Sequence, residues 1–277
     1  MKNSVRIAHI SDIHYRGLNR HDEYRLAFIN FFQQCRDANV DYIVVTGDTF
    51  HTKTQGISPE VIDELNWFFT GCAGSARRGV HVILGNHDLN LTNRNRKDVL
   101  SPILRALNND KIVLHKDSGS YPFLDGEKRY RFGVYSCIDE DKWPDIKPVK
   151  GKCNIALFHG CVHGSETDAD FKLEGDVGVG FFNGYDVVML GDIHKAQFLT
   201  IDQRMAYPGS AIMQSYGESG EKGFLLWDIK PSGKFNVEFR EIPPVHPFVT
   251  LDWTGGVSET VVLAEDYLRG SRFRIRS

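Results

Sequence analysis

Five apolar runs in this sequence each end in a short polar cluster, and this repetition most constrains the fold. The runs and clusters read IAHI-SDIH, IVVT-GDTFH, VILG-NHD, IALF-HG and VVML-GDIH. A buried strand of a parallel sheet is a short apolar run, and the carboxyl ends of parallel strands meet at one edge. The clusters therefore predict a rim of oxygen and imidazole groups, made by Asp12, His14, Asp48, Asn86, His159, Asp192 and His194.

The order of predicted elements favours an α/β architecture. In the first half, apolar runs alternate with amphipathic segments of helical length, which is typical of parallel strands joined by helices. The predicted strands are residues 5–10, 41–46 and 80–84, and the predicted helices are residues 24–38, 59–70 and 97–108. We expect the apolar side of the first helix to carry Leu26, Ile29, Phe32 and Cys35.

The second half carries strands with fewer helices between them. The predicted strands are residues 129–136, 153–158, 185–190 and 203–207, followed by a hairpin of residues 223–229 and 235–241. Two mostly separate sheets that face each other, with helices outside, fit this pattern better than one wound sheet. A Pro-Pro pair at 243–244 indicates a boundary. We therefore expect a main domain at 1–243 and the start of a small, incomplete domain at 244–277.

Composition sets outer limits on the class of protein. The chain has 277 residues, 41% hydrophobic and 25% charged, which suits one large globular domain with an appendage. Its net charge of -3 gives no support for nucleic-acid binding, although bound divalent ions would add positive charge locally. Five cysteines without a CxxC pair indicate reduced thiols and a cytoplasmic protein. We find no secretory signal and no apolar run near the ~20 residues of a membrane span.

The polar clusters offer the chemistry of a site for two divalent ions. Such a site needs a carboxylate between the ions and His, Asp or Asn ligands around each. Asp48 follows Gly47, where the backbone is free to turn, and we predict that Asp48 is the bridge. Asn86 offers a neutral oxygen, and His159 and His194 offer imidazole nitrogens. Bound metal lowers the pKa of water to about 7 and neutralises phosphoryl oxygens, so this site suits phosphoester hydrolysis.

Three further histidines have different interpretations. His87 follows the Asn ligand, so its imidazole is a candidate to protonate or stabilise a leaving oxygen, and Asp88 is a candidate to fix its tautomer. His163 lies close after His159 and remains an alternative metal ligand. His9 lies inside the run VRIAHI, and we interpret it as a core histidine without a catalytic role.

The motifs SDIH, GDTFH, GNHD, FHG and GDIH resemble, in order and spacing, the signature of calcineurin-like metallophosphoesterases. The resemblance covers residues 1–195 and implies a four-layer α/β/β/α sandwich with a dinuclear metal site on its rim. It implies that His87 and Asp88 handle the proton. It assigns one ion to Asp12, His14, Asp48 and His194, and the other ion to Asp48, Asn86, His159 and Asp192.

The last motif departs from the family pattern, because Asp192 stands where the family usually has His. A carboxylate is still a good ligand, so we expect a working site. The hard oxygen and negative charge of Asp192 favour Mn or Mg over softer ions. We therefore expect two divalent ions as cofactors, most simply Mn, with Mg and Fe as alternatives.

Two finer features resemble the SbcD-type (Mre-type) DNA repair nucleases. The segment GDTFH at 47–51 is similar to their Gly-Asp-x-Phe-His motif, whose His contributes to nuclease action, so His51 joins the catalytic candidates. Residues 207–211 (YPGSA), with Gly217-Glu218 and Lys222-Gly223-Phe224 after them, resemble their Pro-Gly-Ser segment and following strand. The segment at 244–248 lies where their small DNA-capping domain begins.

The leading hypothesis is a metal-dependent DNA exonuclease or endonuclease for DNA repair and recombination. The resemblance implies an SbcD-like subunit of an ATPase–nuclease complex, with DNA and an SbcC-type ATPase as partners. The basic residues Arg94, Arg96 and Lys97 follow the NHD cluster, and we expect them either to lie close to passing DNA phosphates or to form an ordinary solvated face. A homodimer is also implied. Two predicted helices carry apolar residues that either form its interface or pack in the core of the chain: Leu65, Phe68, Phe69, Leu100, Ile103, Leu104 and Leu107.

Two other functions fit the same residues. A small-molecule phosphodiesterase or phosphomonoesterase on this scaffold would use the same metal ligands. A non-catalytic DNA-binding or scaffolding subunit would result if Asp192 and the short C-terminal region impaired the site. Activity on linear duplex DNA, on a nitrophenyl phosphodiester, or on neither separates the three hypotheses.

Overall fold

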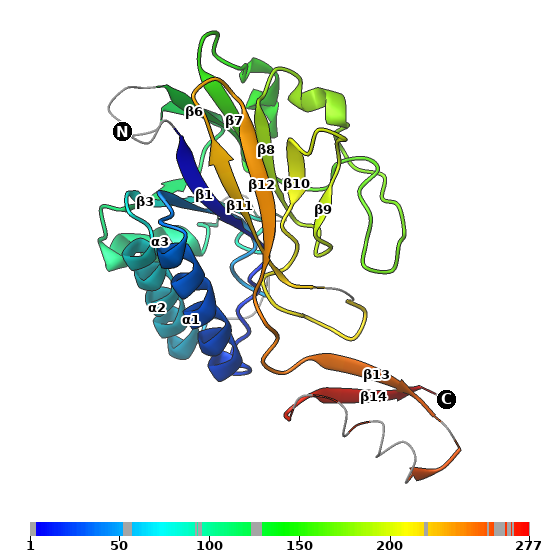
Figure 1. The fold of residues 1–277 in the computed structure, drawn as a ribbon. Coiled ribbons are helices and arrows are strands. Elements are labelled where there is room, and N and C mark those ends of the chain that lie inside the picture. Colours follow the sequence, from blue (N-terminus) through cyan, green and yellow to red (C-terminus); the bar gives the residue numbers. More distant parts are fainter. Residues whose placement is uncertain are drawn as a thin grey trace.

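Among the residues that the structure describes, the fold is built from two sheets, three named α-helices and a separate pair of strands near the C-terminus (Figure 1). A computed structural model provides the coordinates. It describes residues 4–51, 57–91, 93, 96–122, 129–218, 221–253, 255–257, 264, 267 and 269–276. The basic residue Arg94 lies outside the described residues.

The first sheet has six strands in the order β12-β11-β1-β2-β3-β4. Its strands β1 to β4 pair in parallel, whereas β11 and β12 form an antiparallel hairpin on the other side of β1. The carboxyl ends of β1, β2 and β3 therefore lie at one edge. The bounds are β1 (Val5–Ile10), β2 (Tyr42–Thr46), β3 (Gly79–Ile83), β4 (Ile112–His115), β11 (Gly223–Ile229) and β12 (Phe235–Glu241).

The second sheet also has six strands, in the order β5-β6-β7-β8-β10-β9. Strands β6, β7, β8 and β10 are parallel, and β5 and β9 are antiparallel edge strands. The bounds are β5 (Gly119–Pro122), β6 (Tyr130–Tyr135), β7 (Cys153–His159), β8 (Val187–Gly191), β9 (Gln197–Phe198) and β10 (Met205–Tyr207). The short strands β4, β5 and β9, of two to four residues, were not predicted.

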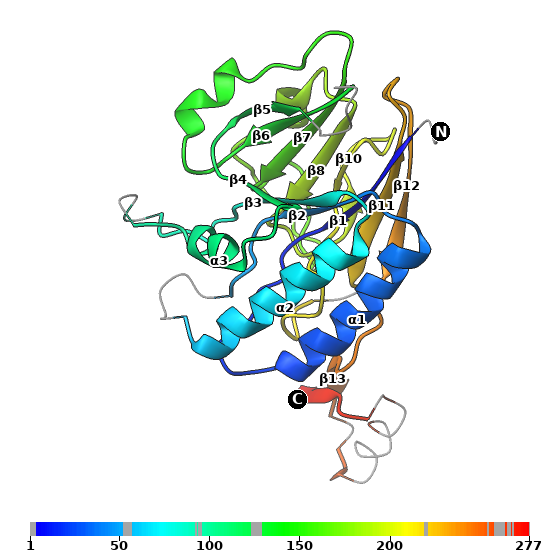
Figure 2. The same cartoon turned by 90° about the vertical axis from the view of Figure 1, so that its left-hand side faces the viewer.

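Helices cover the outer face of the first sheet. Figure 2 shows α1 (His21–Asp37) and α2 (Pro59–Ser75) lying side by side across it, with α3 (Leu100–Leu107) near β3 and β4. Ser58 caps α2, because its hydroxyl accepts a hydrogen bond from Val61 N at 3.4 Å, and Pro59 follows it at the first helical position. The helix therefore begins at residue 59, where the sequence predicts its start.

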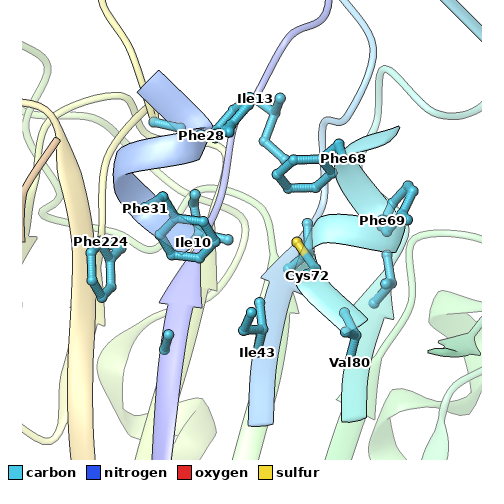
Figure 3. Packing of buried hydrophobic residues seen from close by; sticks show 14 of the residues in the cluster. Ile10, Ile13, Phe28, Phe31, Ile43, Phe68, Phe69, Cys72, Val80 and Phe224 are labelled. Carbon is cyan, nitrogen blue, oxygen red and sulfur yellow. The ribbon is translucent and has the colours of Figure 1, made fainter. Parts of the chain in front are cut away.

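Alternate residues of each strand enter different layers of the core. In β1, Ile7 faces the second sheet, whereas Ile10 faces the helices. Figure 3 shows the helix layer, in which Phe31 and Phe68 pack over strand residues such as Ile10 and Ile43. A third cluster covers the outer face of the second sheet with two 3₁₀ helices, η1 (Glu140–Asp145) and η2 (Val179–Phe182). Because both strand faces are buried, the strands have continuous apolar sequences.

The expected four-layer α/β/β/α sandwich is confirmed as a fold class, since two multi-stranded sheets are flanked by helices. The fourth layer consists of the short helices η1 and η2. Within the described part of the chain, no helix is both long enough and apolar enough to cross a membrane.

The buried side of α1 differs from the prediction. Leu26 and Ile29 are 54% and 53% exposed, whereas Phe28 and Phe31 are fully buried. Aromatic rings remove more apolar surface from water than aliphatic side chains, and here they decide which side of the helix faces the sheet. Phe32 is buried as expected.

The apolar residues that suggested pairing through α2 and α3 lie inside the chain's own core. Leu104 and Leu107 are partly buried against the helix-layer cluster. The others are buried outright, namely Leu65, Phe68, Phe69, Leu100 and Ile103. Core packing therefore explains this apolar surface, and a homodimer keeps only the family resemblance as support.

The C-terminal strands β13 (Phe248–Asp252) and β14 (Arg272–Arg276) pair in parallel and lie beyond the end of β12 (Figure 1). Side chains attach this small sheet to the main body. Arg272 Nη2 donates to Glu23 Oε2 at 2.8 Å, and Tyr216 Oη donates to Phe273 O at 3.1 Å. The Arg272 guanidinium lies 5.0 Å from the ring centre of Phe248. The predicted boundary near 244 and the capping role of the segment stay predictions.

Candidate metal centre

The carboxyl ends of five strands bring the predicted ligands together. The candidates follow or end β1 (Asp12 and His14), β2 (Asp48), β3 (Asn86), β7 (His159) and β8 (Asp192 and His194). His14 Nε2 lies 3.8 Å from Asp12 Oδ1 and 3.7 Å from Asp48 Oδ2. His159 Nε2 lies 3.3 Å from Asp48 Oδ1 and 3.6 Å from Asp192 Oδ1. Residues far apart in the sequence thus meet on one rim, as the five clusters predict.

Asp48 lies between the two halves of this cluster. Its Oδ1 faces His159 and its Oδ2 faces His14, so one carboxylate reaches both sides. This placement is what a bridging ligand requires. Three groups of ligand atoms among the described residues lie within 4.8 Å of one another: Asp12, His14 and His194; His14, Asp48 and His87; and Asp12, Asp48 and His159.

The imidazoles are held with one nitrogen directed at the centre. His14 Nδ1 lies 3.1 Å from Phe50 O, and His159 Nδ1 lies 2.6 Å from Thr46 O. A carbonyl only accepts, so in both rings Nδ1 carries the proton and Nε2 presents its lone pair to the cluster. Such outer hydrogen bonds fix the tautomer of a metal-binding histidine.

His194 is oriented by a carboxylate instead of a carbonyl. Its Nδ1 donates to Glu218 Oε1 at 2.7 Å, and its Nε2 lies 2.9 Å from Nε2 of His14. Two imidazole lone pairs repel at this distance unless a proton or a metal ion lies between them. The facing nitrogens therefore suit a shared cation.

Three ligand-type atoms at the centre are buried without a hydrogen-bond partner among the described residues: Asp12 Oδ1, Asn86 Oδ1 and His159 Nε2. A buried polar atom without a partner is costly in free energy. Asn86 is held in this orientation, because its Nδ2 donates to Asp192 Oδ1 at 2.9 Å. The donor set of carboxylate, amide and imidazole fits divalent ions such as Mn²⁺. These residues therefore fit a dinuclear centre.

The backbone at the centre adopts an uncommon conformation. Asp12, His14 and Asp48 each have φ of 51°, and Asp192 has φ of 100°. Non-glycine residues rarely adopt positive φ, and such strain gathers at functional sites. Gly85 is required for a different reason, because a Cβ there would collide with the backbone N and Oδ1 of Asp48. The glycines of the motifs thus leave room for the ligands packed behind them.

The charges of the cluster shift its pKa values. Burial opposes ionisation of Asp48, but the neighbouring histidines His159, His14 and His87 outweigh it and hold its pKa below the usual range. Burial lowers the pKa of His14 to about 3, and burial raises the pKa of Asp12 to about 6. The site thus favours a charged central carboxylate beside a neutral imidazole, which are the ligand forms that bind metal.

His87 lies at the rim, with its side chain 27% exposed and its Nε2 3.8 Å from Asp48 Oδ2. We expected Asp88 to fix its tautomer, but His87 Nδ1 instead donates to His51 O at 2.7 Å. The carboxylate of Asp88 is fully buried and accepts backbone N–H groups from Thr49, Phe50 and Gly85. Asp88 therefore ties the turn after β2 to the turn after β3.

Burial and the nearby charge of Asp48 raise the pKa of Asp88 to about 7. The imidazole of His51 lies close to the other rings, with its centre 5.7 Å from that of His14 and 6.5 Å from that of His87. Burial and the positive charge of Arg16 lower the pKa of His51 to about 4. His51 is thus placed beside the centre, while its catalytic role stays a prediction.

The remaining histidines separate clearly. His163 is exposed and belongs to none of the ligand groups of the described residues. His9 is fully buried, and its Nε2 lies 3.0 Å from Thr46 Oγ1 and 3.1 Å from Leu190 O, so it joins the two sheets. The interpretation of His9 as a core residue agrees with this placement.

The sequence interpretation gave no role to Glu218, although it lies against a metal-ligand candidate. Burial alone would raise the pKa of Glu218, but the hydrogen bond from His194 and the charge of Lys222 lower it to about 2. The signal was a polar Gly-Glu pair in the segment before β11. A sequence alone does not reveal that this loop folds back onto the rim.

A two-sheet sandwich with a rim of carboxylate, amide and imidazole ligands defines the class of metallophosphoesterases. Residues 5–196 match the family model described as calcineurin-like phosphoesterase, and the chain belongs to this family. Members of this family use divalent metals, in agreement with the candidate ligand groups. The identity of the metal stays a proposal.

Curated relatives extend the comparison. The chain is 39% identical over 250 residues to uncharacterized protein R555 of Acanthamoeba polyphaga mimivirus, covering 84% of this chain but 18% of that protein. It is 22% identical to the DNA double-strand break repair protein Mre11 of Methanopyrus kandleri, covering 98% of this chain and 62% of that protein. The SbcD component of the nuclease SbcCD of Escherichia coli is 23% identical, covering 89% of this chain and 70% of that protein.

Among solved structures, the chain is similar to GAP50, described as the anchor in the inner membrane complex of Plasmodium. The TM-score is 0.57 at 15% identity, with 88% of each chain covered. At this identity the likeness shows the shared fold alone.

Proposed function

We propose that this chain is a metal-dependent DNA nuclease of the SbcD (Mre) type, which hydrolyses phosphodiester bonds at the rim of the sandwich. The observation that carries the proposal is the extent of similarity to a DNA double-strand break repair protein and to a nuclease subunit. The matches cover 98% and 89% of this chain, whereas the family model ends at residue 196. The similarity therefore includes the hairpin of β11 and β12, beyond the phosphoesterase core.

The residues of the rim divide the chemistry between them. Two divalent ions, held by the seven ligand candidates, would supply a nucleophile from water at neutral pH and neutralise phosphoryl charge. Asp192 adds a hard oxygen ligand, which favours Mn or Mg. The strand ends hold the ligands in fixed positions, so the reacting phosphate is oriented by a preformed site.

His87 is proposed to act on the leaving oxygen. Its Nδ1 donates to a carbonyl, so Nε2 carries a proton only when the ring is cationic. A cationic His87 at the rim can donate that proton to the leaving oxygen, and the carbonyl of His51 stabilises the charge. His51 itself is proposed to assist from its position beside His14 and His87.

The partners of the chain, DNA among them, are proposed from the resemblance, and the charge of the small sheet adds little support. Arg272, Arg274 and Arg276 alternate along β14, so their guanidinium groups lie on one face of the small sheet. Arg272 and Arg276 are already paired with carboxylates, which reduces the charge available for DNA phosphates. An SbcC-type ATPase and a second copy of the chain are further proposed partners.

The proposal is tested by measuring hydrolysis of two substrates, with a blank, under the same metal conditions. Linear duplex DNA, a nitrophenyl phosphodiester and a buffer blank are incubated with Mn²⁺, Mg²⁺ or chelator. We expect DNA cleavage that depends on metal and is fastest with Mn²⁺. Cleavage of the small diester alone would instead establish a small-molecule phosphodiesterase. Inactivity on both, with metal bound, would establish a non-catalytic subunit.

A further inference from the structure

A buried lysine lies directly behind the metal-ligand candidate His194. Lys222 immediately precedes β11, and its side chain is 4% exposed. Its Nζ donates to His194 O at 2.9 Å and lies 3.0 Å from Glu218 Oε2 and 3.7 Å from Asp168 Oδ1. A buried ammonium group is costly in free energy unless carboxylates and carbonyls surround it. The surroundings of Lys222 supply both.

Glu218 connects this lysine to the imidazole ring. Its Oε1 accepts from His194 Nδ1 at 2.7 Å. Its Oε2 accepts from Ser210 Oγ at 3.1 Å and from Gln214 N at 3.0 Å, in addition to facing Lys222. The Lys222–Glu218 ion pair therefore holds His194 at two points, the ring nitrogen and the main-chain carbonyl.

We propose that Lys222 and Glu218 are positioning residues of the metal centre, which together hold Nε2 of His194 in the direction of the ion. The inference rests on the proposed metal centre and on His194 as one of its ligands. Glu218 fixes the ring tautomer, while Lys222 fixes the carboxylate of Glu218 and the backbone of His194. Loss of either residue lets the ring rotate and weakens one metal position, while the ligands of the other position stay in place.

The test is a calorimetric titration in which Mn²⁺ is added to metal-free protein. No substrate is present. Removal of an outer partner of a metal ligand typically weakens metal binding by about 10- to 100-fold. We expect Lys222→Met to weaken one of two Mn²⁺ sites by this factor. The unfolding temperature with chelator measures any general loss of stability separately.

Lys195→Met is the matched control. Lys195 follows His194 directly and pairs with Glu166 at 3.1 Å and Asp170 at 2.5 Å. The substitution therefore removes a neighbouring charge that is held by carboxylates other than Glu218. We expect this variant to bind both ions like the wild type. Wild-type affinity at both sites in Lys222→Met would overturn the proposal, as would equal weakening in Lys195→Met.

If Lys222→Met does not fold, the variant Glu218→Gln tests the positioning role instead. This change keeps the size of the side chain and removes the charge that orients the ring. One weakened Mn²⁺ site in Glu218→Gln supports the proposal, and two sites of wild-type affinity overturn it. The Mn²⁺ titration uses no substrate, so it tests the positioning role independently of the nuclease proposal. If the wild-type chain binds two ions but does not cleave DNA, the nuclease proposal fails and the positioning role still stands.

Discussion

At the scale of single residues, the site depends on groups whose outer partners are already fixed. His14 and His159 direct Nε2 to the centre because their Nδ1 atoms meet backbone carbonyls. Asp12 and Asp48 hold positive φ, so the fold maintains a strained backbone there. The residue types and their order were predictable from the motifs. The partners were not, because Phe50 O and Thr46 O carry no sequence signal.

His87 is predicted to act in the reaction and not in binding metal. His87→Ala should reduce the rate of DNA cleavage by about 100- to 10,000-fold, the usual contribution of a general acid or base. The number of bound Mn²⁺ ions should remain that of the wild type. The ligand atoms of His87, His14 and Asp48 lie within 4.8 Å of one another, so His87 could also bind a metal ion. The number of bound ions in the variant therefore decides between the two roles. Loss of one ion in this variant would make His87 a ligand.

Asp192 is predicted to serve the second metal position, both as a ligand and as the acceptor that orients Asn86. Asp192→Ala should weaken that position, and the first position should keep its affinity. Asp192→His should preserve folding and shift preference toward softer ions such as Zn²⁺. Competition between Mn²⁺ and Zn²⁺ measures this shift. Unchanged metal content and rate in Asp192→Ala would make Asp192 a bystander.

At the scale of elements, strands buried on both faces determine where the site forms. Residues of β1 and β2 alternate between the helix layer and the layer between sheets, so their ends are rigid. The layer between the sheets contains a pair of histidines. His81 Nδ1 lies 2.9 Å from His115 Nε2, and Phe132 of the second sheet packs against both rings.

This histidine pair predicts a loss of stability in acid. Burial lowers the pKa of His81 to about 3 and that of His115 to about 4. An unfolded histidine binds its proton near pH 6.5, so between about pH 6.5 and 4 the unfolded chain binds more protons. Stability therefore falls as the pH falls, by up to about 1.4 kcal/mol per pH unit for each ring.

The double variant His81→Phe with His115→Phe keeps the rings and removes their titration. The urea midpoint, followed from pH 6.5 to 4.5, should depend less steeply on pH than in the wild type. His163→Ala is the control, because His163 is exposed and should leave the slope unchanged. An unaltered slope in the double variant would show that these two rings do not govern acid stability.

Helix α2 is predicted to contribute stability to the single chain. Phe68 is fully buried, and Phe68→Ala should lower the free energy of unfolding by about 3–5 kcal/mol. Ile62 on the same helix is 36% exposed, and Ile62→Ala should cost far less. Urea unfolding measures both variants. Sedimentation that shows an oligomer dissociating in Phe68→Ala, at unchanged stability, would instead place this ring in an interface.

At the scale of the whole molecule, two facing sheets share one metal rim, and a small C-terminal sheet contacts the main body through Glu23 and Tyr216. The long apolar runs made β1, β2, β3, β7 and β8 predictable, since such runs fit only doubly buried strands. The rotation of α1 and the return of the loop near Glu218 were not predictable. Both depend on contacts between distant parts of the chain, such as Phe31 with Phe224 and His194 with Glu218.

The most direct test of the account is the number of Mn²⁺ ions bound per chain in the wild type and in Asp48→Ala. A carboxylate that faces both His14 and His159 should serve both ions. We predict two ions for the wild type, weakened binding at both positions in Asp48→Ala, and no metal-dependent hydrolysis by the variant. Two tightly bound ions and near wild-type cleavage in Asp48→Ala would contradict the dinuclear centre described above.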